Sequence, residues 1–119
     1  MARSFRHVHR GVQGRVPANF NMPGVVQSRQ AVIQITAAEV SFDTGANVII
    51  GPDGTPVEQA FMYHIGDADI WVSNISPHFN DHFAGEEGGV EYVLHVDFPS
   101  PLNVAVTITV EDETIAEVV

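Results

Sequence analysis

Hydrophobic and polar residues alternate strictly along two stretches near the carboxyl end of the chain. In VEYVLHVDF, residues 90–98, one face holds Val90, Tyr92, Leu94, Val96 and Phe98. In LNVAVTITVE, residues 102–111, one face holds Leu102, Val104, Val106, Ile108 and Val110. A period of two is typical of a strand that packs one face on a core. Both stretches are therefore predicted to be strands with these faces inward.

The segment Pro99-Ser100-Pro101 joins these two strands and leaves their pairing open. A tight hairpin would place Leu94 near Val106. Two prolines in three residues would instead suit a chain that crosses to a second sheet, because proline cannot donate a ladder hydrogen bond.

Shorter apolar runs rich in β-branched residues precede these strands. They are AVIQIT (31–36), EVSF (39–42), NVII (47–50), VEQAFMYHI (57–65) and DIWVSNIS (69–76). Turn signals such as GPDGTP separate them, and no segment keeps a helical period. The pattern predicts an all-β fold, either an antiparallel β-sandwich or a small jelly-roll-like barrel.

Residues 1–30 follow a different pattern. VPANFNMPG, residues 16–24, has no hydrophobic period, and Pro17 and Pro23 interrupt regular structure. We therefore expect an extended basic N-terminal arm over residues 1–30, followed by an acidic sandwich domain over residues 31–119.

Charge divides the chain at the same place. The five cationic residues are Arg3, Arg6, Arg10, Arg15 and Arg29, whereas all 15 carboxylates lie from Glu39 onward, so +5 and −15 give the net charge of −10. A strongly negative body repels phosphates, which makes a nucleic-acid partner unfavourable. It attracts the arm, either onto its own domain or onto a neighbouring subunit.

The arm carries the main functional hypothesis. Arginine forks bind carboxylates in pairs of hydrogen bonds, and an extended arm can add to a neighbour's sheet. The contact residues are expected to be Arg3, Phe5, Arg6, Arg10, Arg15, Phe20 and Arg29. We therefore predict a structural assembly protein: a capsid decoration or cement protein of a phage-like virion, forming a small homo-oligomer such as a trimer within a larger lattice.

Localisation follows from what the chain lacks. Its first residues lack the apolar run that is typical of a signal peptide, and no stretch approaches the roughly 18 apolar residues of a membrane span. We expect a protein of the virion surface, or of the cytoplasm during assembly, with no membrane partner. The host, the symmetry and the origin of the lysine-free acidic composition stay open.

The segment PHFNDHFAGEEGG, residues 77–89, is predicted to be a long polar loop. Its potential ligand residues are His78, Asp81, His82, Glu86 and Glu87. Imidazole and carboxylate bind transition metals, but the spacing of the two histidines aligns them only on a helix, which Pro77 disfavours. No metal is therefore expected.

Two alternative functions use this loop. One is a lectin-like carbohydrate-binding module, in which the loop acts with Trp71; that residue is either buried in the core or a stacking platform on an exposed sheet face. The other is a small metal-dependent enzyme built on His78, His82 and a carboxylate of the loop.

Other candidate chemistry is weaker. His7 and His9 lie on one side of an extended segment, but no carboxylate follows before Glu39, so they are interpreted as an extension of the basic arm. Asp67 and Asp69 lack a calcium-loop pattern. There is no cysteine, nucleophile elbow, phosphate loop or dinucleotide motif, so we expect neither enzyme activity nor a cofactor.

Overall fold

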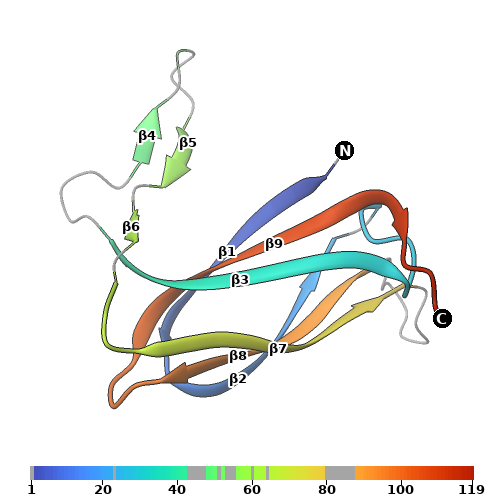
Figure 1. Ribbon diagram of the computed structural model, residues 1–119. Coiled ribbons are helices and arrows are strands. Elements are labelled where there is room, and N and C mark those ends of the chain that lie inside the picture. Colours follow the sequence, from blue (N-terminus) through green and yellow to red (C-terminus); the bar gives the residue numbers. More distant parts are fainter. Residues whose placement is uncertain are drawn as a thin grey trace.

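The protein is an all-β sandwich (Figure 1), and the computed structural model describes residues 2–22, 24–42, 48–50, 52, 56–59, 61–63, 65–79 and 88–119. The strands within these residues are β1 (Arg3–Val12), β2 (Gly14–Asn21), β3 (Ala31–Phe42), β4 (Val48–Ile50), β5 (Pro56–Gln59), β6 (Phe61–Tyr63), β7 (Asp69–His78), β8 (Gly89–Asp97) and β9 (Leu102–Ile115). Sheet A has the order β1-β9-β3-β6, sheet B has the order β2-β8-β7, and β4 pairs with β5. All pairings are antiparallel, which confirms the predicted fold class.

The extended N-terminal arm is not confirmed, because its residues form strands of the same sandwich. β1 pairs with β9 from Arg3↔Val110 to Val12↔Leu102, and β2 pairs with β8 from Gly14↔Val96 to Asn21↔Gly89. Pro17 does not prevent this pairing, because β2 is an edge strand and its outer side needs no donor. The segment lies across its own domain, which is one of the two positions that its charge predicts.

The chain crosses from one sheet to the other between β1 and β2 and again between β8 and β9, and the two crossings lie at the same corner. Gln13 alone joins β1 to β2, and the nearby Gly11 and Gly14 have φ values of 60° and 73°. These left-handed conformations favour glycine, which lets the chain turn sharply. At the second crossing, Pro99-Ser100-Pro101 carries the chain from β8 in sheet B to β9 in sheet A. The hairpin pairing of Leu94 with Val106 is therefore wrong, and the crossing between sheets is correct.

The core lies between β8 and β9 and follows the predicted alternation. Its buried residues are Met22, Val26, Val90, Tyr92, Leu94, Val96, Val104, Val106, Ile108 and Val110. Phe5 and Phe20, expected to anchor an arm to a partner, pack against this core with their ring centroids 6.0 Å apart. The apolar residues of the N-terminal segment thus cover the open side of their own sandwich.

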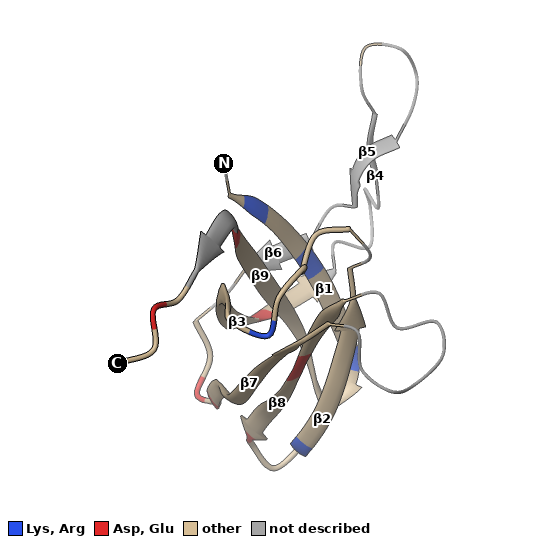
Figure 2. Cartoon of the chain, turned by 90° about the vertical axis from the view of Figure 1, so that its right-hand side faces the viewer, with Lys and Arg blue, Asp and Glu red and all other residues tan. Residues whose placement is uncertain are grey.

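The arginines are spread over the molecule, and Figure 2 shows positive segments on both β1 and β2. The Arg3 guanidinium lies 5.3 Å from the centre of the Phe5 ring. Arg6 donates from Nε to Thr107 Oγ1 at 3.2 Å and lies 5.7 Å from the centre of the Tyr63 ring. Arginines that the sequence places in one terminal segment therefore lie on strands of both sheets.

Two histidines of β1 face the interior of the sandwich. The His7 and His9 rings are 4.4 Å apart, and His9 Nε2 shares a hydrogen bond of 2.8 Å with Tyr92 Oη. Burial, and secondarily repulsion from His7, lowers the pKa of His9 below its usual 6.5. Burial raises the pKa of Tyr92 to about 12, so its hydroxyl stays neutral. The pair is therefore an interior contact that favours uncharged imidazole.

The inward faces of β8 and β9 can be tested by truncation. Replacing Leu94 or Ile108 with alanine should lower the free energy of unfolding by about 2–5 kcal/mol each, because both side chains are completely buried. The Ile65→Ala variant is the matched control: Ile65 is fully exposed, so a change of no more than about 0.5 kcal/mol is expected in urea unfolding. Equal losses at all three positions would contradict this assignment.

The position of His9 in the interior predicts acid sensitivity. Since the pKa of His9 is lower in the folded protein, the unfolded chain binds more protons, and stability should fall as pH drops below about 6.5. His9→Gln keeps a polar group near Tyr92 but cannot be protonated, so its stability should fall less than that of the wild type. Urea unfolding from neutral to mildly acidic pH measures both slopes, and identical slopes would contradict the prediction.

Candidate functional site

The outer face of sheet B brings polar and aromatic side chains from three strands into rows. β2 and β7 both pair with β8, so cross-strand partners align: Arg15, His95 and Trp71 form one row, and Asn19, Glu91 and Ser76 form another. Pro17, Val93 and Ser73 form the row between them. Neighbours across a sheet lie close enough to act together, which makes this face the candidate site.

Trp71 and His95 form the aromatic end of this face. Their rings are stacked with centroids 4.7 Å apart and planes 6° apart, and Ser73 Oγ lies 2.7 Å from His95 Nε2. Since β7 is the edge strand of sheet B, no strand of this sheet lies on the other side of Trp71, whose side chain is 47% exposed. Of the two alternatives for Trp71, the exposed sheet face is correct and the core is wrong.

A hollow of about 230 Å³ adjoins the stacked rings. Its lining residues are Gly14, Arg15, Trp71, His95, Val96 and Asp97. Arg15 belongs to the predicted arm, yet it lies on β2 in register with His95 rather than on a separate segment. The hollow therefore combines an aromatic surface with a guanidinium donor and a carboxylate acceptor.

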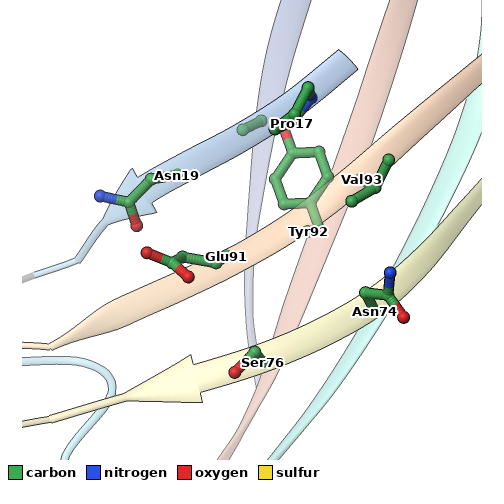
Figure 3. Close-up of a pocket in the computed structure, with 8 residues that line it drawn as sticks. Pro17, Asn19, Asn74, Ser76, Glu91, Tyr92 and Val93 are labelled. Carbon is green, nitrogen blue, oxygen red and sulfur yellow. The ribbon is translucent and has the colours of Figure 1, made fainter. Parts of the chain in front are cut away.

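A larger hollow of about 480 Å³ lies farther along the same face (Figure 3), lined by Pro17, Ala18, Asn19, Asn74, Ser76, Glu91, Tyr92 and Val93. Tyr92 is buried in the core, so only its backbone side can line this hollow. Asn74 has a φ of 54° within a bulge of β7, where the pairing with β8 shifts between Ser73 and Ser76. The bulge changes the direction of β7 side chains here, next to amide, hydroxyl and carboxylate groups.

His78 contacts Asn19, one of the residues that line the larger hollow. It is 7% exposed, and its Nε2 donates to Asn19 Oδ1 at 2.8 Å, which orients the Asn19 amide. Strand β7 continues through His78, so the predicted loop begins later than expected. Trp71 lies seven residues away, on the order of 20 Å along an extended strand, so the two side chains are not in contact. Asp81, His82, Glu86 and Glu87 lie outside the described residues.

Of the metal candidates in the loop, only His78 belongs to the described residues. Within the described parts of the chain, no three histidine or carboxylate residues are placed to hold an ion. His7 and His9 do lie on one side of β1, but that side is the core, where His9 contacts Tyr92. The same described residues contain no helix long and apolar enough to cross a membrane.

Sequence reasoning found Trp71 but missed the residues that surround it. The inward face predicted for residues 90–98 leaves Glu91 and His95 on the opposite, outer face, but the sequence did not link either residue to Trp71. Asn19 and Arg15 were assigned to an arm, since the period of two in β2 is obscured by Pro17. The missing signal was strand pairing, which one sequence does not specify when crossings replace hairpins.

Comparison with known proteins finds no matching family model, no matching curated protein and no matching solved structure. Function must therefore be inferred from these side chains and their geometry.

Proposed function

We propose that this protein is a carbohydrate-binding module and that the outer face of sheet B is its recognition surface. The observation that carries the proposal is the exposed Trp71 ring, stacked on His95 beside a polar hollow. Sugars present apolar C–H faces that pack on aromatic rings and hydroxyl groups that hydrogen-bond to polar side chains. An amphipathic surface with one flat ring and several donors and acceptors matches both requirements.

Preorganisation supports this role. Ser73 fixes the His95 ring, and His95 supports one face of Trp71, so the indole is held before any ligand arrives. At the larger hollow, His78 does the same for the Asn19 amide. Groups that are already ordered lose less conformational entropy on binding, which favours affinity from a shallow surface.

Truncation of the aromatic platform tests the proposal. Trp71→Ala should weaken sugar binding by about tenfold or more, a loss of ~1.4 kcal/mol or more, because the stacking surface disappears. Binding is first sought on a glycan array and then measured by calorimetry. The matched control is Tyr63→Ala, which removes an aromatic residue of similar exposure from β6 in sheet A and should leave affinity unchanged.

The chain contains a single tryptophan, so its fluorescence reports on this site alone. A sugar that binds the wild-type protein should shift or quench the emission in a saturable way. If array hits bind without altering the emission, or if Trp71→Ala binds as tightly as the wild type, the proposed surface is wrong.

A second candidate function is the predicted capsid-type assembly role, and the observation that favours it is the open edge of β1. This ten-residue strand contains no proline, unlike the edge strands β2 and β7, and it carries Arg3, Arg6 and Arg10 in a protein of net charge −10. A basic edge facing an acidic surface of the next copy would be a head-to-tail contact, which generates rings or lattices. This form of assembly requires no arm that leaves the domain.

Solution mass tests this second candidate. The wild type should form oligomers at low salt that dissociate as salt rises, since exposed charges are screened within roughly 10 Å at 0.1 M. Arg3→Glu should reduce assembly, whereas Arg15→Glu, the same charge change on sheet B, should not. A monomer at every salt concentration would contradict self-assembly.

A further inference from the structure

We propose that the outer face of sheet B binds an extended, neutral oligosaccharide chain that lies along the strands and occupies both hollows. This inference rests on the proposed carbohydrate-binding function. It adds the ligand class: an internal stretch of a chain, in place of a single terminal sugar.

The spacing of the two hollows carries the inference. His95 lines the hollow of about 230 Å³ and Glu91 lines the hollow of about 480 Å³. Both belong to β8 and project from the same face, four residues apart, which corresponds to about 13 Å along a strand. One pyranose ring cannot reach both hollows, whereas a short chain of linked sugars can.

Adjacent rows of the face line the two hollows. Arg15, His95 and Trp71 line the smaller hollow, and their row lies next to the row of Pro17, Val93 and Ser73. Val93 and Pro17 line the larger hollow, which therefore extends to the row next to Trp71. The two hollows are thus neighbours along the strands.

The charge of the face selects a neutral ligand. Asp69, Glu91 and Asp97 are exposed carboxylates of this face, and Arg15 is the single guanidinium among its described residues. Excess acceptors suit a ligand that is rich in hydroxyl donors. A chain of uronic acids or sulfated sugars would be repelled here and by the net charge of −10.

The edges of sheet B oppose the main alternative, a peptide added as a further strand. Pro17 lies in β2 and Pro77 lies in β7, and β7 also carries the bulge at Asn74. Proline and bulges block strand addition at an edge. Binding to the face, with hydrogen bonds from side chains, is therefore favoured over binding to the edge.

The experiment is a chain-length series measured by calorimetry and tryptophan fluorescence. Neutral gluco-, manno- and xylo-oligosaccharides are compared from monosaccharide to hexasaccharide. Affinity should rise with length by at least about tenfold until both hollows are filled, and then level off. A monosaccharide that binds as tightly as the hexasaccharide would overturn the extended-chain inference while leaving carbohydrate binding intact.

Variants at the far hollow give the second readout. Glu91→Gln and Asn19→Ala should weaken a hexasaccharide by about tenfold and leave a disaccharide bound at Trp71 unaffected, whereas Trp71→Ala should weaken both. Glu111→Gln is the charge-matched control on β9 in sheet A and should change neither. Far-hollow variants that bind the hexasaccharide like the wild type would overturn the inference.

Two further outcomes separate the claims. If acidic oligosaccharides bind more tightly than neutral ones, the neutral ligand class is wrong. If no saccharide of any length binds or changes the Trp71 emission, the proposed function itself fails. Thermal melts of each variant confirm that loss of binding is not loss of fold.

Discussion

The structure depends on the burial of one apolar stripe shared by β8 and β9. Each is an inner strand of its sheet, and their inward side chains, from Val90 to Val96 and from Val104 to Val110, are almost completely removed from water. Each buried side chain of this size contributes roughly 1.5–3 kcal/mol relative to exposure. The proline-rich corner turns the ribbon over on itself, so the two halves of the stripe face each other and form the core.

This stripe also explains the position of the N-terminal segment. Residues 3–21 run antiparallel to residues 89–110 along both sheets, and their apolar residues cover the flank of the core. The position of the segment is thus set by backbone pairing and apolar burial along its whole length, and not by its positive charge. The arginines remain at the surface of strands whose inward positions are taken by Phe5, Phe20 and the two interior histidines.

The same pairing creates the candidate site. Sheet B has its inner face in the core, so its outer face is available for function, and the register places residues from three distant parts of the sequence in rows. The edges of this sheet are blunted by Pro17, Pro77 and the Asn74 bulge, whereas its face carries the exposed aromatic ring. Stability and recognition are thus separated on the two sides of one sheet.

The sequence alone determined that the described residues form strands and no helix, and it determined the inward faces of residues 90–98 and 102–111, because a period of two is a local property of the chain. It also placed Glu91 and His95 outward, but it left Trp71 either in the core or on an exposed sheet face. Only the tertiary structure decided that Arg15 and Asn19 belong to the same face, and that β8 and β9 lie in different sheets. Those relations depend on pairing between residues more than 50 positions apart, which is set by burial of the complete core and leaves no local pattern.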